Sequence, residues 1–162
     1  MTTAFTEMYI DGVQVDVTSG YTFSTTGEHT VNYMLKNNTI LTGSTLSGLF
    51  QNCTSLEEIV ITNSVTTIGD KVFQNCSSLK KITLGNGVTK LGTATMALFS
   101  QPIFSGCTNL KEITCNTTTA PTLTSKALNG IQNNGGTLYV PRGSDYSSWT
   151  NVLTTWTIQY IT

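Results

Sequence analysis

A segment of this 162-residue chain repeats itself at a constant spacing, and that repeat limits the folds open to the chain. The sequence FQNCTSLEEIVITNSVTTIG is followed by FQNCSSLKKITLGNGVTKLG, and a third copy, FSGCTNLKEITC, begins after an interruption. Apolar residues therefore recur 23 residues apart, for example from Phe50 to Phe73 and from Leu56 to Leu79. A fixed period with apolar residues at constant phase indicates a solenoid, in which each copy forms one coil.

Each copy contains the pattern L-x-x-I-x-[IL], whose last two apolar positions alternate and so point to one face of a short strand. The pattern occurs as LEEIVI and LKKITL, and with a final cysteine as LKEITC. One such strand cannot bury its apolar face alone. Successive coils must therefore stack, with their strands paired in parallel around a continuous apolar interior. We expect the Phe and the Cys of each copy to fill the opposite corner of the coil, with Cys acting as a small hydrophobic residue.

One repeat position is occupied by Asn52, Asn75 and Gly106. Asn and Gly share a tolerance of positive φ. We therefore expect a left-handed turn residue at this corner of each coil.

The pattern FxxCxxLxxIxI, followed by SVTTIG or GVTKLG, resembles the leucine-rich repeats of the BspA-like type. The tail LYVPRGSDYSSW, residues 138 to 149, resembles the closing segment common in such proteins from gut bacteria. The resemblance implies a cell-surface or secreted protein of a host-associated bacterium that acts in adhesion. Together with the repeat pattern it predicts a mainly β chain with short helical turns, folded as a right-handed leucine-rich-repeat solenoid of about three to five coils.

We expect three segments along the chain. Residues 1–36 form an N-terminal antiparallel β-hairpin cap, residues 37–140 form the solenoid with an insertion near 93–102, and residues 141–162 form a C-terminal cap. The start, MTTAFTEMYI, lacks the basic region and apolar core of a signal peptide, so we expect this chain to be a mature form or an excised fragment if the protein is exported.

The first segment alternates apolar and polar residues with a period of two. The Asp-Gly pair at 11–12 is the strongest two-residue hairpin signal. A second alternating stretch over 21–35 brings the prediction to about four antiparallel strands in two hairpins. We expect this unit to cover the open strand edge at the start of the solenoid. The phrase GEHTVNYML also resembles the last strands of small immunoglobulin-like modules that precede such repeats.

The end of the chain is rich in aromatic residues. From Asn116 the stretch TTTAPTLTS breaks the phase of the repeat, and Ala127-Leu128 takes the place of Phe in a fourth coil. Trp149 and Trp156 are expected to cover the last coil, with stacking on sugars as the alternative.

Charge and composition exclude several functions. Only 10% of the residues are charged and the net charge is -1, so no electrostatic footprint for nucleic acid is present. No apolar run reaches the roughly 20 residues needed to span a bilayer, so we expect no membrane insertion. We assume a monomer.

The four cysteines are expected to be free and buried. Cys53, Cys76 and Cys107 share one repeat position, so their side chains stack in parallel, which is poor geometry for a disulfide. Cys115 takes the strand position of Ile61 and Leu84 and is expected to be another buried thiol. Clustered pairs such as C-x-x-C are absent, so no metal site is predicted.

No catalytic site and no cofactor are predicted, because the sequence lacks the motifs of nucleophilic, metal-dependent and nucleotide-dependent enzymes. Matched charges on adjacent strands form the rows Glu57, Lys80, Lys111 and Glu58, Lys81, Glu112. Opposite charges on paired strands support register, and a ligand-facing strip is the alternative interpretation. Lys81 lies between Glu58 and Glu112, which disfavours a carboxylate pair of the glycosidase type.

The candidate ligand-binding face comprises the strand positions that point away from the interior, and its ligand is expected to be a protein or a glycan of a host or neighbouring cell. These residues are Glu58, Val60, Thr62, Lys81, Thr83, Glu112, Thr114 and Tyr139. A structural spacer without a ligand and, more remotely, a glycan hydrolase remain open. The insertion supplies a second candidate contact through Met96, Leu98 and Phe99, unless these apolar residues fold back onto the coil.

Overall fold

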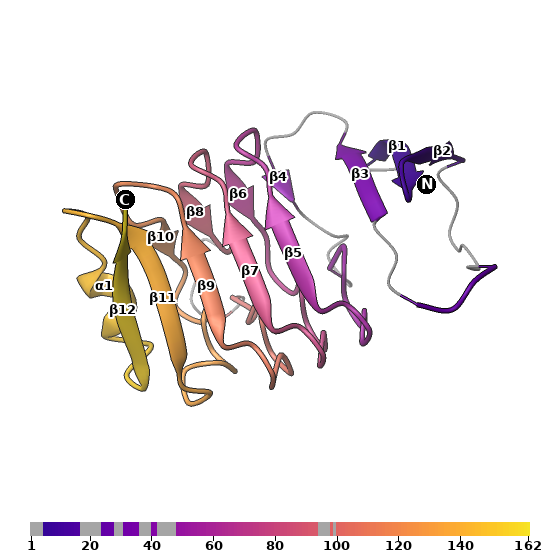
Figure 1. Cartoon of the computed structure of the whole chain (residues 1–162). Helices are drawn as coiled ribbons and strands as arrows, with labels where there is room; N and C mark the ends of the chain where they lie inside the picture. The colour runs from indigo at the N-terminus through magenta and orange to yellow at the C-terminus, as the bar shows by residue number, and fades with distance from the viewer. Residues whose placement is uncertain are drawn as a thin grey trace. The chain divides into compact units, whose positions relative to one another are not determined.

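The computed structural model describes residues 5–16, 24–27, 31–35, 40–41, 48–93, 98 and 100–162. The chain forms two compact units, Met1–Asn38 and Thr39–Thr162 (Figure 1). Each unit has its own sheet structure.

The first unit is a three-stranded antiparallel sheet in the order β2-β1-β3. Strands β1 (Phe5–Ile10) and β2 (Val13–Val15) form the predicted hairpin, and β3 (Val31–Leu35) pairs with the other side of β1. Both residues of the Asp11-Gly12 turn have positive φ, of 51° and 83°, which suits the twist of a tight hairpin. The first strand of the second predicted hairpin, near Tyr21 and Phe23, lies outside the described residues.

The second unit is a solenoid built from two parallel sheets, which lie one behind the other in Figure 1. The larger sheet has the order β12-β11-β9-β7-β5 and the smaller has the order β10-β8-β6-β4. Each strand of the smaller sheet is followed along the chain by a strand of the larger one, which gives about four turns. This architecture confirms the predicted mainly β solenoid. The strands of the larger sheet are β5 (Glu58–Ile61), β7 (Lys81–Leu84), β9 (Glu112–Cys115), β11 (Gly136–Pro141) and β12 (Trp156–Ile161), and those of the smaller sheet are β4 (Ile40–Leu41), β6 (Thr67–Ile68), β8 (Lys90–Leu91) and β10 (Thr122–Leu123).

The repeat period fixes the register of the larger sheet. Ile82 pairs with Ile59 on one side and with Ile113 on the other, and Ile113 pairs with Leu138. Ile82, Ile113 and Leu138 are almost completely buried, so this row is the interior of the solenoid. The next interior row contains Cys115, which pairs with Leu84 as predicted and is fully buried. Residues of the opposite parity face outward.

Stacked aromatic rings fill the corner that leads from each strand of the smaller sheet to the next strand of the larger sheet. Phe73 lies between Phe50 and Phe104, with ring centroids 5.5 and 5.7 Å apart and ring planes within 7° of parallel. Each buried thiol of this corner donates a hydrogen bond to the carbonyl of the preceding coil, from Cys76 to Phe50 at 3.1 Å and from Cys107 to Phe73 at 3.0 Å. The corner therefore holds neighbouring coils at a constant offset.

The predicted left-handed turn is confirmed at this corner. Asn52, Asn75 and Gly106 have φ values of 65°, 61° and 81°, and Gly130 continues the series at 99°. A side chain at Gly106 would collide with Asn75, because a Cβ there would lie 2.6 Å from the Asn75 Oδ1. Leu128 lies two residues before Gly130, as Phe does in the earlier coils, which confirms it as the replacement for Phe in a fourth coil.

The later part of the chain continues both sheets. Strand β10 pairs with β8 through Thr122 opposite Lys90 and Leu123 opposite Leu91, although Cys115 and Leu123 are one residue further apart in the sequence than Leu84 and Leu91. After Pro141, β12 pairs in parallel with β11 over six residue pairs, so the segment expected to be a C-terminal cap also supplies the fifth strand of the larger sheet.

The two tryptophans cover the interior. Trp149 on the short helix α1 (Ser147–Thr150) is completely buried and donates its indole N–H to the Pro121 carbonyl at 2.9 Å. Trp156 is 7% exposed and donates to the Ile131 carbonyl at 3.0 Å. Their rings are closed to solvent, so the sugar-stacking alternative for the tryptophans does not hold.

The cysteine prediction is correct for three residues and wrong for Cys53. All four thiols are free, and Cys76, Cys107 and Cys115 are fully buried. Cys53 is exposed, because it belongs to the first Phe-Cys corner of the stack and a described corner packs against it on one side only.

Replacing Phe73 with Ala is expected to destabilise the second unit by about 3 to 5 kcal/mol, because it removes the central ring of the stack and leaves a cavity. Phe50 is half-buried at the end of the described stack, so Phe50→Ala is the matched control and should cost clearly less. Chemical denaturation gives both values. Equal losses of stability in the two variants would show that the central position of Phe73 in the stack adds nothing to its contribution.

Thiol titration is expected to find one reactive cysteine in the folded chain and four after denaturation. Desolvation and the neighbouring Cys76 raise the pKa of the Cys53 thiol above its ordinary value, so its labelling should be slower than that of free cysteine near neutral pH and should accelerate as the pH rises. Burial raises the pKa of Cys115 to about 12, which keeps it protonated. The variant Cys53→Ser should remove the fast signal. A second reactive thiol in the folded state would contradict the buried stack.

Candidate recognition surface

The outward face of the larger sheet carries seven of the eight residues predicted for a ligand face. Two rows cross the strands in register, as the strand pairs show. The first row contains Glu58, Lys81, Glu112, Thr137 and Thr157, and the second contains Val60, Thr83, Thr114, Tyr139 and Gln159. We refer to the second row as the central row.

Exposure differs along the central row. Val60 is 71% exposed on β5, whereas Thr83, Thr114 and Tyr139 are half-buried between neighbouring strands. Gln159 on β12 is exposed. The row thus offers a regular surface on a rigid sheet, with its most protruding apolar side chain at one end.

Thr62 is the exception among the predicted residues. Strand β5 ends at Ile61, so Thr62 lies in the following turn, where its hydroxyl is 2.9 Å from the hydroxyl of Ser64. It is exposed but does not belong to the sheet face.

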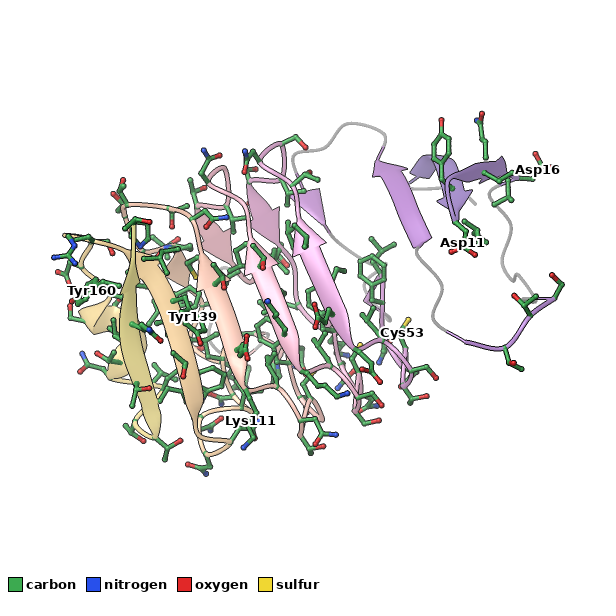
Figure 2. All side chains as sticks on the ribbon, in the orientation of Figure 1. Asp11, Asp16, Cys53, Lys111, Tyr139 and Tyr160 are labelled. Atoms are coloured by element: carbon green, nitrogen blue, oxygen red, sulfur yellow. The ribbon has the colours of Figure 1, made fainter. Side chains whose placement is uncertain are left out.

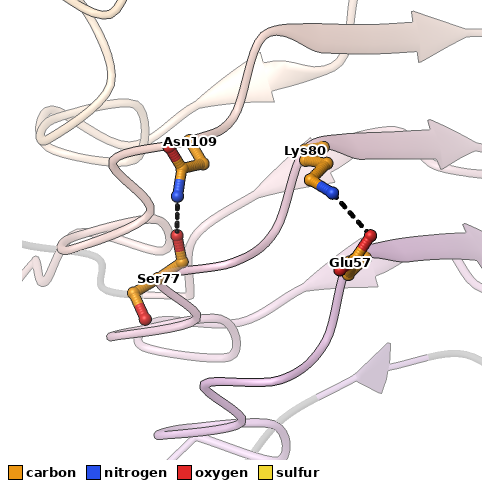
Figure 3. Close-up of polar contacts among 4 residues, drawn as sticks. All are labelled: Glu57, Ser77, Lys80 and Asn109. Atoms are coloured by element: carbon orange, nitrogen blue, oxygen red, sulfur yellow. Dashed lines mark hydrogen bonds and ion pairs between the residues drawn. The ribbon is translucent and has the colours of Figure 1, made fainter. Parts of the chain in front are cut away.

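Ion pairs and amide contacts join adjacent turns beside the face. Lys80 and Glu57 lie 2.6 Å apart, and the Asn109 amide donates to the Ser77 carbonyl at 2.8 Å (Figure 3). Lys111 donates to the Asn134 carbonyl of the next turn, so the predicted row of Glu57, Lys80 and Lys111 is only partly an ion-pair row. Exposed pairs of this kind contribute at most about 1 kcal/mol each. They therefore support register more than stability.

The second charge row is in register, and an ion pair forms on one side of Lys81. Lys81 pairs in register with Glu58 on β5 and Glu112 on β9, and its ammonium lies 3.9 Å from the Glu112 carboxylate. The strand carrying Lys81 separates the two carboxylates. This arrangement offers no carboxylate pair facing a common cleft.

The Asp70 carboxylate is hydrogen-bonded to residues at both ends of the insertion. One carboxylate oxygen accepts hydrogen bonds from the Thr93 hydroxyl at 2.7 Å and the Thr93 backbone N–H at 3.3 Å, and the other accepts from the Gln101 N–H at 3.3 Å. Leu98 is 76% exposed, so it does not fold back onto the coil. Met96 and Phe99 lie outside the described residues.

The back of the solenoid has a shallow hollow of about 380 Å³ between β10 and α1. It is lined by small and apolar side chains, among them Pro121, Leu123, Leu128, Ser148 and Val152. Uncharged residues make up the whole lining, so the hollow lacks groups for acid-base chemistry.

A buried polar cluster lies under the last coil. The Tyr146 hydroxyl donates to the Thr117 carbonyl at 3.0 Å and lies 2.7 Å from the Thr117 hydroxyl. Burial, with the nearby Cys115, raises the pKa of Tyr146, so it stays protonated. The two hydroxyls and the Thr117 carbonyl are thus joined by hydrogen bonds, and the cluster is structural.

Sequence reasoning missed three outward residues of the face, Thr137, Thr157 and Gln159. Thr157 and Gln159 belong to β12, which was expected to be part of a separate cap. The alternation of WTIQYI over Trp156–Ile161 is the signal that could have identified this strand. Asp70 was also missed, because a clamp between residues 31 positions apart leaves no local pattern.

Residues 44–119 match the family model described as a BspA type leucine rich repeat region (6 copies). The repeats match those of BspA-type leucine-rich repeat proteins. The comparison with curated proteins and the comparison with solved structures gave no match. The matched segment includes β5, β7 and β9, and therefore most of the predicted ligand face. A repeat family of this kind supports a module for surface interaction and is generally not enzymatic.

None of the helices in the described part of the chain is long and apolar enough to cross a membrane. Within the same residues, no group of three or more His, Cys, Asp and Glu side chains is placed to hold a metal ion.

Proposed function

We propose that the chain is a non-enzymatic recognition module that binds a protein or glycan through the outward face of its larger sheet. The observation that carries this proposal is the register of the central row, which sets Val60, Thr83 and Thr114 side by side on adjacent strands. These outward residues can vary without changing the interior, because interior and face alternate along each strand.

The location we propose is extracellular or on a cell surface, with adhesion to a host or neighbouring cell as the role. The BspA-type repeat match supports this location. The low charge of the chain also suits contact that is dominated by shape, hydroxyl groups and apolar side chains.

A structural spacer is the alternative, because regular stacking alone would extend a larger surface protein without any ligand. The spacer predicts that no outward residue affects binding. One experiment distinguishes the recognition module from the spacer.

The test is a triple variant of the central row, Val60→Lys, Thr83→Glu and Thr114→Lys, in which charges alternate so that neighbouring strands attract each other. Binding is measured against a glycan array and a panel of purified secreted and cell-surface proteins. The expected result is loss of capture with an unchanged melting temperature, because the three side chains point to solvent.

The matched control changes the corresponding outward row of the smaller sheet, Thr67→Lys, Lys90→Glu and Thr122→Lys, which is also in register. This variant should keep full binding. Capture retained by the central-row variant, or lost equally in both variants, would refute the proposed face. A chain that captures no ligand of either class would favour the spacer.

A further inference from the structure

Tyr139 differs from every other residue of the central row. It is the one aromatic side chain of that row, and it lies on β11 between Thr114 and Gln159 (Figure 2). Its neighbours along β11, Leu138 and Val140, are buried, so the ring points outward.

The ring nevertheless remains half-buried, whereas Val60 in the same row is 71% exposed. Tyr139 lies on an inner strand, so the two neighbouring strands cover part of its side chain and the rest is open to solvent. Its ring offers an apolar surface and its hydroxyl a hydrogen-bonding group, and we refer to this side chain as the aromatic platform.

Polar groups surround this platform on both rows. Thr114 and Thr137 supply hydroxyl groups, Gln159 supplies an amide that both donates and accepts, and Glu112 supplies a carboxylate that accepts. Adjacent strands lie about 4.8 Å apart, so these groups flank the ring at the spacing of the sheet.

Charge is distributed unevenly over the same face. Strands β11 and β12, GTLYVP and WTIQYI, contain no charged residue, and the central row is uncharged along its whole length. The charged side chains of the outward rows are Glu58, Lys81 and Glu112, and Lys81 lies 3.9 Å from Glu112. Glu112 is paired with Lys81, so the outward rows leave no unpaired charge beside Tyr139. The complement of this end of the face is therefore an uncharged ligand, because a charged group would lose hydration without gaining an unpaired partner.

We infer that the Tyr139 end of the outward face binds a neutral oligosaccharide, and this inference rests on the proposed recognition function. A sugar ring presents C–H groups on its face and hydroxyls at its edge, which match the aromatic platform and the surrounding hydroxyl, amide and carboxylate groups. The ligand is bound in the plane of the sheet, with one ring over Tyr139 and its hydroxyls bonded to Gln159 and Thr114.

The experiment uses the full chain and named probes: tetrasaccharides of β-linked glucose, α-linked mannose and β-linked N-acetylglucosamine, with a sulfated tetrasaccharide as the charged comparison. Array binding selects the probe, and titration calorimetry gives its affinity. A neutral probe should bind, its affinity should be insensitive to salt, and the sulfated probe should not bind.

The variants separate stacking from folding. Tyr139→Ala should weaken binding of the neutral probe at least tenfold. Tyr139→Phe keeps the ring and removes only the hydroxyl, so it should weaken binding by only about threefold. Gln159→Ala should also weaken binding of the neutral probe. Thr122→Ala, at an exposed position of the smaller sheet, is the control and should leave the affinity unchanged. Circular dichroism verifies that each variant is folded.

The outcomes distinguish this inference from the proposed function. A neutral probe bound equally well by the chain and by folded Tyr139→Ala would overturn the glycan site. Capture of a protein from the panel that depends on the central row, without binding of any neutral probe, would overturn the glycan site and leave the recognition function standing. A chain that binds neither a neutral probe nor a protein of the panel would overturn both the glycan site and the recognition function.

Discussion

The whole second unit depends on the in-register stacking of its coils. The Phe stack, with ring centroids 5.5 to 5.7 Å apart, sets one corner, and the positive φ residues from Asn52 to Gly130 let each coil turn there at the same place. The thiol of each later corner then donates to the carbonyl of the coil before it. Because a shift of one residue would exchange the two faces of every strand, this corner also decides which side chains reach solvent.

This constraint separates structure from recognition. The interior rows are nearly identical from coil to coil, as Ile59, Ile82, Ile113 and Leu138 show, and they are held by packing. The outward rows change from charged on β5, β7 and β9 to uncharged on β11 and β12. A face whose chemistry changes along a regular support can bind a ligand at one end through side chains that the fold does not need.

The sequence predicts what repeats and fails where the chain departs from the repeat. Asn52, Asn75 and Gly106 revealed the turn, and Leu84 and Cys115 revealed the interior, because each comparison between copies is a comparison of equivalent environments. Burial of Cys53 was wrongly expected, since the first corner of a stack lacks the neighbour that the pattern implies. Strand β12 and the Asp70 clamp were missed because they depend on contacts without a repeated counterpart. The ligand face was predictable as a set of positions, whereas the strand β12 that flanks Tyr139 on one side was not.

The most direct measurement is the strand register in solution, from cross-strand nuclear Overhauser contacts between β7 and β9 of the labelled chain. The account predicts contacts that pair Lys81 with Glu112 and Thr83 with Thr114, which leaves Ile82 and Ile113 inside. Contacts shifted by one residue, so that Thr83 pairs with Ile113 or with Cys115, would turn interior residues to the face. That result would contradict both the stacking of the coils and the recognition surface built on it.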